Sequence, residues 1–305
     1  MNITTKFASR EEWVEGRKSS IGASESPILF GLGFANQSLF SLWAAKVHGA
    51  KEDIDSKLMR RGQLMEPGFL AVMQDEIPDS KCVACDQNKV YYRDGCEFIS
   101  ATPDAFVYRG QDLFLGEFKR IMYNRDSWSD GIPLRVQVQV QQQMACIPDV
   151  KGVYVLPLMG GYDGDPILVE RDDDFIVGTL IPTVQKFWDR YVIPEVAPPL
   201  DGSAITSRIL AKVHPNDSGE VIQLEEELSV LFNDHDDLSS QKKVVDERLT
   251  YISNELKLRL GDASYAVLPD GRCVSWKTQD RKEFTVKASS SRVIRFAKKL
   301  PKNVN

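Results

Sequence analysis

The chain has 305 residues and a mass of 34.4 kDa, enough for one large domain or two smaller ones. Its 42% hydrophobic and 27% charged residues exclude a fibrous or wholly disordered chain, and its formal charge of −6 excludes a protein that coats nucleic acid through bulk positive charge. No apolar run approaches the roughly 20 residues of a membrane helix, and the N-terminus lacks a secretory signal, so we expect a cytoplasmic protein without membrane contact whose five cysteines are free thiols.

Residues 1–200 mix helical and extended patterns. Apolar residues recur at helical spacing after Ser38, and strands are indicated by short apolar runs around turns. The predicted elements, in chain order, are helices beginning at 39 and spanning about 58–73, strands within 98–120, a glutamine-rich helix over 133–146 and a strand over 153–159. Because helices and strands alternate, we predict an α/β domain.

Prolines and a glycine between residues 194 and 202 predict a domain boundary, so residues 201–305 are expected to form an accessory region. Eight apolar side chains in this region follow the 4-3 spacing of heptads and predict one helix of about 35 to 40 residues. We call them the heptad seam: Leu224, Leu228, Leu231, Leu238, Val245, Leu249, Ile252 and Leu256. His235 and Lys242 fill the two remaining positions. The seam fits a helix packed on its own core, which we favour, or an intermolecular coiled coil.

After the predicted helix, residues 265–276 are predicted to form a hairpin, with Pro269-Asp-Gly271 as its turn.

Acidic and basic residues lie in different parts of the accessory region. Residues 217–237 hold eight acidic and no basic residues, whereas residues 271–305 hold ten basic and two acidic ones. The basic tail fits contact with DNA or a partner, which we favour, or pairing with the acidic start of the helix.

Asp104 and the pair Glu117 and Lys119 carry the candidate chemistry. Glu117 and Lys119 are two residues apart, so on a strand they share one face. We expect Asp104 to approach them from the adjacent strand or turn. Two carboxylates supply hard oxygen ligands for Mg²⁺, and the lysine can orient or help to deprotonate a water molecule. The alternative for these residues is an ion pair on an edge strand.

Five motifs resemble, in order and separation, those of the lambda-exonuclease-like (YqaJ-type) viral recombinase nucleases, a branch of the PD-(D/E)xK superfamily. They are Ile21-Gly-Ala-Ser-Glu25, Arg61-Gly-x-x-x-Glu66-Pro67, Ala101-Thr-Pro-Asp104, Glu117-x-Lys119 and Gln139-Val-Gln-x-Gln143-Met144. The resemblance extends from about Arg17 to Tyr191. It implies a restriction-endonuclease-like core, a central mixed sheet flanked by helices, followed here by the long helix and hairpin of the accessory region.

The resemblance also implies roles for residues of a metal centre. Asp104 and Glu117 match the family's metal-binding carboxylates, and Lys119 matches its catalytic lysine. Glu66 matches a further glutamate on a helix that completes a two-metal site. Gln139 matches a glutamine that positions water, the lysine or phosphate.

Arg17 and Ser24 match the residues that hold the 5′-terminal phosphate of DNA in such enzymes. An arginine fork and a hydroxyl are good donors to phosphate. Two positions depart from the family: Glu25 stands where many members have aspartate, and Gln143 stands where the superfamily has tyrosine. No role is therefore expected of Gln143, and most glutamines of residues 137–143 are expected on a polar helix face.

The activity implied is that of a Mg²⁺-dependent deoxyribonuclease, with Mn²⁺ as a substitute, that digests one strand of linear double-stranded DNA from its end, 5′ to 3′. Phage or prophage origin in a bacterial host, a single-strand annealing protein as partner and a homo-oligomer, with a ring-shaped trimer as the expected form, are implied as well. Two alternatives stay open. An endonuclease would cut closed circular DNA, and a non-catalytic scaffold would bind DNA ends only.

Two other kinds of site are not expected. Cys82, Cys85 and Cys96 have no fourth Cys or His nearby, which a tetrahedral zinc or iron–sulfur site needs. No Gly-x-x-x-x-Gly-Lys-Ser/Thr run occurs, which argues against an ATP-driven helicase.

Overall fold

The computed structural model describes residues 3–49, 56–121, 125–159, 162–283, 285, 288 and 292–297. It divides the chain into two compact units, Met1–His214 and Pro215–Asn305, which are described separately. Among the described residues, no helix combines the length and the apolar character that crossing a membrane requires.

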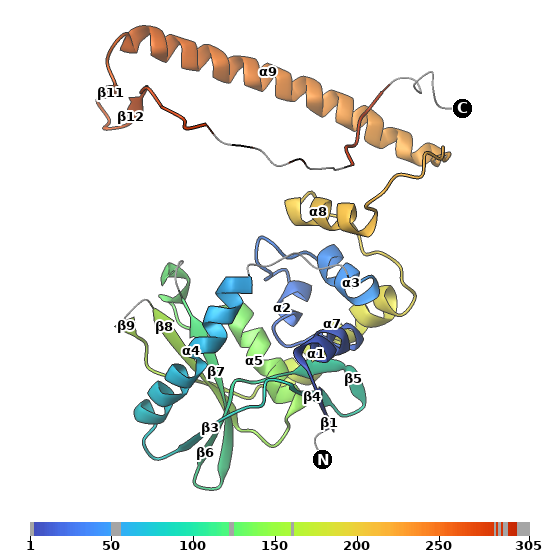
Figure 1. Ribbon diagram of the computed structural model, residues 1–305, viewed down its shortest axis with the longest axis vertical. Coiled ribbons are helices and arrows are strands. Elements are labelled where there is room, and N and C mark those ends of the chain that lie inside the picture. The colour runs from blue at the N-terminus through green and yellow to red at the C-terminus, as the bar shows by residue number, and fades with distance from the viewer. Residues whose placement is uncertain are drawn as a thin grey trace. The chain divides into compact units, whose positions relative to one another are not determined.

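The first unit contains eight α-helices and ten strands among its described residues. Figure 1 shows how these elements follow one another along the chain. The helices are α1 (Arg10–Gly16), α2 (Ser26–Leu29), α3 (Leu39–Val47), α4 (Ser56–Glu76), α5 (Leu134–Cys146), α6 (Asp173–Phe175), α7 (Ile181–Phe187) and α8 (Ala204–Val213). The strands are β1 (Ile3–Lys6), β2 (Ile21–Gly22), β3 (Lys81–Ala84), β4 (Lys89–Arg93), β5 (Cys96–Ala101), β6 (Ala105–Arg109), β7 (Asp112–Arg120), β8 (Gly152–Met159), β9 (Tyr162–Asp163) and β10 (Ile167–Glu170).

The strands form two mixed sheets. The larger has the order β10-β8-β7-β6-β3, with β9 beside β8, and the smaller has the order β1-β4-β5-β2. In the larger sheet β7 and β8 run parallel, whereas β6 and β7 form an antiparallel pair with a short connection. In the smaller sheet β2 and β5 run parallel.

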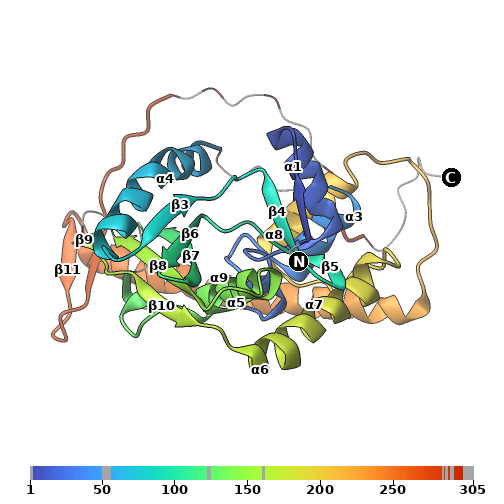
Figure 2. The ribbon, with the colours of Figure 1, turned by 90° about the horizontal axis from the view of Figure 1, so that it is seen from below.

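Helices cover both faces of the larger sheet. Val153 and Val155 of β8 pack in one apolar cluster with α5, whereas Tyr154 and Leu156 pack in another cluster with α4. This alternation follows from the period of a strand and explains why β8 is apolar at every one of these positions. Figure 2 shows α4 and α5 on opposite sides of β6, β7 and β8. The predicted α/β core, a mixed sheet flanked by helices, is confirmed.

The first unit ends later than the sequence predicted. Ile205 and Ile209 of α8 are buried in its main core, and the hydroxyls of Thr206 and Ser38 hydrogen-bond at 2.9 Å. The division lies after His214 rather than near residue 200. The proline-rich segment therefore leads to one more helix of the same core, because α8 has an apolar face that α3 can cover.

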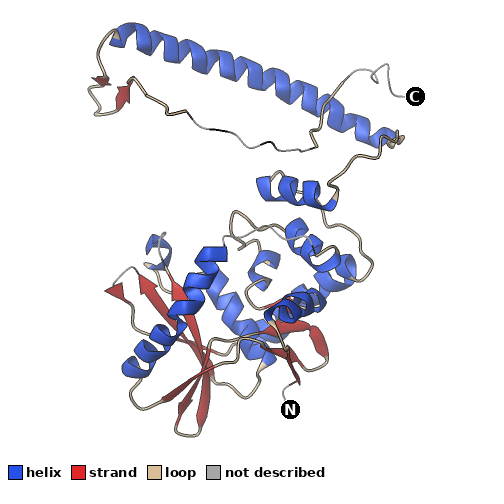
Figure 3. Cartoon of the chain, viewed as in Figure 1, coloured by secondary structure: helices blue, strands red, loops and turns tan. Residues whose placement is uncertain are grey.

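The second unit consists of α9 (Ser229–Leu260) and a hairpin of β11 (Tyr265–Val267) and β12 (Cys273–Ser275), as Figure 3 shows. Gly271 has a φ of +86° in the hairpin turn, a conformation that favours glycine. The predicted long helix and hairpin are confirmed, but α9 has 32 residues rather than about 35 to 40, and Leu224 and Leu228 of the heptad seam lie before its start. Leu260 is the one buried side chain of α9 among the described residues, so the seam does not pack on a core within this unit. Lys287, Lys298, Lys299 and Lys302 of the basic tail lie outside the described residues.

Candidate functional site

Asp104, Glu117 and Lys119 come together where β6 begins beside β7. Asp104 directly precedes β6, and the other two side chains lie on β7, its antiparallel neighbour. The backbone N–H of Phe118 donates to Asp104 Oδ2 at 2.7 Å. Lys119 Nζ donates to Glu117 Oε1, also at 2.7 Å. The structure thus brings the three residues into the convergence that their spacing predicted.

Glu117 is held by three donors although it is only 5% exposed. Lys119 Nζ and Gln139 Nε2 both donate to Oε1, the second at 2.8 Å. Gln143 Nε2 donates to the other oxygen, Oε2, at 2.6 Å. Gln139 also accepts from Lys119 Nζ at 2.7 Å. A buried carboxylate held at both oxygens has one orientation, so the site is preorganised.

The glutamines of α5 serve more than one neighbour. Gln139 and Gln143 are four residues apart and share the helix face that lies toward β7. Gln142 Nε2 donates to the carbonyls of Ile21 and Ser100 at 2.8 and 3.0 Å, which ties α5 to β2 and β5. Gln141 Nε2 donates to the carbonyl of Glu170 at the end of β10, and Gln141 Oε1 accepts from the N–H of Asp172 beyond it. The expected polar helix face is therefore wrong, because these four glutamines are buried by partners distant in sequence.

Gln143 is the functional candidate that the sequence analysis missed. It is 1% exposed, borders the cleft described below and contacts Glu117 directly. Its Oε1 has no hydrogen-bond partner among the described residues, so one acceptor of the side chain is available. The spacing of four residues from Gln139 was the signal that pointed to this contact.

A close approach of α4 brings Glu66 to the same site. A Cβ at Gly116 of β7 would lie 2.8 Å from Met73 Sδ, so glycine permits α4 to pack this near the strand. Glu66 lies two turns before Met73 and is partly buried. Burial raises the pKa of Asp104 well above its usual range, and the charges of Glu117 and Glu66 raise it further, against the opposing effects of the Phe118 N–H and Lys119.

This excess of negative charge fits a bound cation. Carboxylates that share a buried site repel each other, and hard oxygen donors suit Mg²⁺ or Mn²⁺. In the arrangement shown, the described residues include no group of three or more His, Cys, Asp and Glu side chains that could hold an ion by themselves. The donors from the protein would therefore be completed by water or substrate oxygens, as is usual for Mg²⁺.

A cleft of about 240 Å³ connects the carboxylates with Arg17. Arg17 belongs to a cationic cluster that also includes Lys46 and Glu25. The lining of the cleft includes Asp104, Glu117 and Gln139 together with Arg17 and Ser24. Five of the seven sequence-predicted residues thus border one space, whereas Glu66 and Lys119 are not part of its lining.

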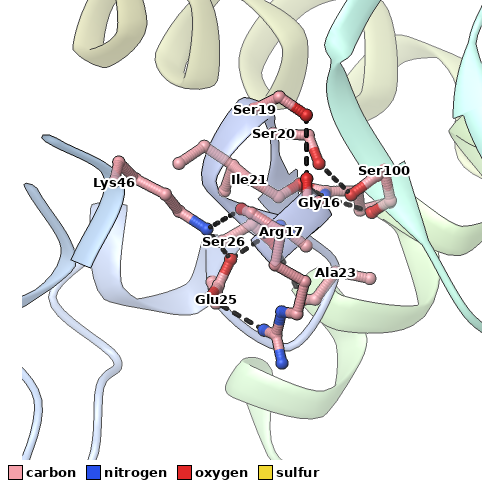
Figure 4. Close-up of polar contacts among 12 residues, drawn as sticks. Gly16, Arg17, Ser19, Ser20, Ile21, Ala23, Glu25, Ser26, Lys46 and Ser100 are labelled. Carbon is pink, nitrogen blue, oxygen red and sulfur yellow. Dashed lines mark hydrogen bonds and ion pairs between the residues drawn. The ribbon is translucent and has the colours of Figure 1, made fainter. Parts of the chain in front are cut away.

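Glu25 organises the cationic cluster, which Figure 4 shows. Its Oε1 pairs with Arg17 Nη2 at 2.8 Å, and its Oε2 pairs with Lys46 Nζ at 2.6 Å. Lys46 Nζ also donates to the Arg17 carbonyl at 2.9 Å. Burial raises the pKa of Glu25, but Arg17, Lys46 and the Gly22 N–H outweigh that effect and lower it to about 2. Two cations around one carboxylate leave a net charge of +1 beside the cleft.

The surroundings fix Arg17 and the turn that carries Ser24. The Arg17 guanidinium lies 4.9 Å from the centre of the Trp13 ring. The hydroxyls of Ser20 and Ser100 hydrogen-bond at 2.7 Å and join the start of this turn to β5 (Figure 4). Ser24 itself is exposed.

Lys46 was not predicted as part of the site, although a lysine on the otherwise apolar helix α3 is a signal of a buried ion pair.

The chain is similar to a known protein family, to a curated protein and to solved structures. A family model described as the YqaJ-like viral recombinase domain matches residues 12–148. The Uncharacterized protein YqaJ of Bacillus subtilis (strain 168) is 25% identical over 264 residues, which cover 85% of this chain and 81% of that protein. Two crystal structures of LHK-Exo, an alkaline exonuclease from Laribacter hongkongensis, one of them in complex with dAMP, are similar at 20% and 21% identity with TM-scores of 0.45 and 0.49. Each covers 67% of this chain and 99% of its own.

Proposed function

Because residues 12–148 match the model of the YqaJ-like viral recombinase domain, the family that the five motifs resemble, we propose that the chain is a Mg²⁺-dependent deoxyribonuclease. Its proposed reaction is hydrolysis of one strand of linear double-stranded DNA from the end, 5′ to 3′, with Mn²⁺ able to replace Mg²⁺. The observation that carries the proposal is one cleft bordered by a buried carboxylate pair and by a cationic cluster. A nuclease needs these two features for metal-assisted hydrolysis and for phosphate binding.

In this proposal Asp104 and Glu117 hold the metal, with Glu66 as a further carboxylate. A bound divalent cation would supply a water of lowered pKa and positive charge next to the phosphate under attack. The contribution of the protein is orientation. Gln139 and Gln143 fix Glu117 at both of its oxygens, so that the carboxylate is aligned before substrate arrives.

Lys119 is placed to act on the substrate. Its ammonium has three N–H groups, and two of them donate to Glu117 and Gln139. The third is available to a water molecule or a phosphate oxygen in the cleft. Its side chain is 23% exposed, so an incoming phosphate can reach it. Lys119 would orient the attacking water and offset the charge that develops on the phosphate.

Arg17 and Ser24 would bind the 5′-terminal phosphate at the other side of the cleft. Glu25 occupies one nitrogen of the guanidinium and holds the group in place, while the exposed hydroxyl of Ser24 adds a donor. Holding the end of one strand at a fixed position relative to the carboxylates selects the bond to be cut. The proposed partners are double-stranded DNA ends and, as the resemblance to the family implies, a single-strand annealing protein for the strand that is left.

The test is digestion of end-labelled linear duplex and of closed circular duplex, with and without Mg²⁺. We expect the linear substrate alone to be degraded, only with the metal, and from the 5′ end. Cutting of the circle would instead support an internal endonuclease. Binding to ends without any metal-dependent hydrolysis would support a non-catalytic scaffold and refute the proposal.

A further inference from the structure

The heptad seam of the second unit is exposed along its length. α9 has 32 residues, which at 1.5 Å per residue span about 48 Å. None of the eight seam residues is less than 37% exposed. On α9 itself the seam runs from Leu231 to Leu256, more than three heptads, and only His235 and Lys242 interrupt it. Such a stripe is typical of pairing with another helix.

We propose that α9 pairs with α9 of a second copy of this chain in an antiparallel coiled coil. The polar position Lys242 favours this orientation. In a parallel pair, Lys242 would face Lys242 of the second copy inside the apolar seam, where unpaired charge is costly. In an antiparallel pair each seam residue faces one from the alternate heptad position, so Lys242 can lie opposite Leu238. Its ammonium already hydrogen-bonds Asp246 at the edge of the seam at 2.6 Å.

The charged residues beside the seam also favour the antiparallel register in which Lys242 lies opposite Leu238. With Lys242 opposite Leu238, Asp234 lies next to Arg248 of the second copy, and by symmetry the pair occurs twice. Both side chains are exposed in the single chain. Over a longer range, residues 229–237 at the start of α9 hold three acidic and no basic residues, whereas residues 242–259 hold five basic and three acidic ones. Antiparallel pairing sets the acidic end of one helix against the basic end of the other, whereas parallel pairing sets acid against acid.

In the described part of the tail, Phe296 contacts the seam beside His235. The Phe296 ring stacks on His235 with centroids 3.6 Å apart and packs edge-on against Phe232 at 5.3 Å. His235 is the polar residue that precedes Leu238 in the seam. In the proposed register His235 faces Val245 of the second copy, so Phe296 leaves this position when the helices pair. The seam residues from Leu238 to Leu256 are already exposed.

The first test compares the mass of the full-length chain in solution with that of a seam variant carrying Leu238→Glu and Leu249→Glu. The matched control carries Ser240→Glu and Asn254→Glu, which add the same charge to the outer face of the same helix. We expect the mass of the wild-type assembly to fall by half in the seam variant and to stay unchanged in the control. A wild-type chain that is monomeric, or a seam variant with wild-type mass, would overturn the proposal.

The second test uses charge reversal, because the seam variant can also lose helix α9. Asp234→Arg and Arg248→Asp each place like charges side by side and should weaken self-association by about tenfold or more. Together they should restore it. The two positions are fourteen residues apart on one helix, about 21 Å, so restoration cannot arise within one chain or in a parallel pair. Failure of the double variant to recover would refute the antiparallel register. Neither test depends on the proposed nuclease activity.

Discussion

Replacement of Gln143 tests how far the orientation of Glu117 controls catalysis. Gln143→Leu keeps the approximate size of the side chain and removes the 2.6 Å hydrogen bond to Glu117 Oε2. A hydrogen bond to a charged group contributes about 1.5–3 kcal/mol, and about 1.4 kcal/mol corresponds to a tenfold change in rate. If the whole contribution is lost in the transition state, kcat falls by about 10- to 150-fold.

The assay is steady-state hydrolysis of a 5′-phosphorylated linear duplex at saturating Mg²⁺. We expect KM for the DNA to change little, because Arg17 and Ser24 are untouched. Gln142→Leu is the matched control, since Gln142 is the neighbouring buried glutamine and donates only to the backbone carbonyls of Ile21 and Ser100. The control should lower the free energy of unfolding and leave kcat of the folded enzyme near that of the wild type.

Equal kcat values for the wild type and Gln143→Leu would refute this reasoning. Gln143 would then be a core residue that happens to lie against Glu117. The same conclusion would follow if Gln142→Leu lowered kcat as strongly as Gln143→Leu, because the loss would then report on α5 as a whole.

Further predictions concern the other residues of the site. Asp104→Asn should abolish cleavage while DNA binding in Ca²⁺ persists, measured by gel shift; substantial Mg²⁺-dependent cleavage would exclude Asp104 as a ligand. Lys119→Ala should lower kcat at least about a hundredfold, as expected for a positioned catalytic group, with Mg²⁺ affinity unchanged; near-normal turnover would make it a structural ion-pair partner. Arg17→Ala should narrow the difference in hydrolysis rate between 5′-phosphorylated and 5′-hydroxyl duplexes. An unchanged ratio of the two rates would mean that Arg17 does not bind the 5′-terminal phosphate. The pKa of Glu25 is lowered to about 2, so its contribution to stability is present above the usual glutamate pKa of about 4.3 and is lost as the pH falls toward 2. Between those values the free energy of unfolding should fall more steeply for the wild type than for Glu25→Gln, and identical slopes would contradict the arrangement around Glu25.

Much of the carboxylate centre was predictable because its geometry is local. The alternation of a strand places Glu117 and Lys119 on one face of β7, and a short hairpin connection returns Asp104 to their side. The helix of Gln139 was equally clear from its pattern. Once this helix packs against the sheet, Gln139 reaches Glu117.

The rest of the site depends on contacts between segments distant in sequence. Lys46 reaches Glu25 from α3, and Gln142 reaches Ile21 and Ser100 across the core. Nothing in the neighbouring sequence distinguishes a buried glutamine with such partners from one on a solvated face. The same limit explains the misplaced domain boundary: α8 joins the first unit through Ile205 and Ile209, whose partners lie far earlier in the chain.

The most direct test of the proposed function is a comparison of the wild type with Glu117→Gln on a linear duplex labelled at one 5′ end. The substitution keeps the size of the side chain and replaces the carboxylate that three donors hold in place. We predict that the wild type releases the label as a small product in Mg²⁺ and not in EDTA, and that Glu117→Gln releases none in either. Release by the variant at the wild-type rate, or by the wild type in EDTA, would contradict a metal-dependent nuclease centre at Asp104 and Glu117.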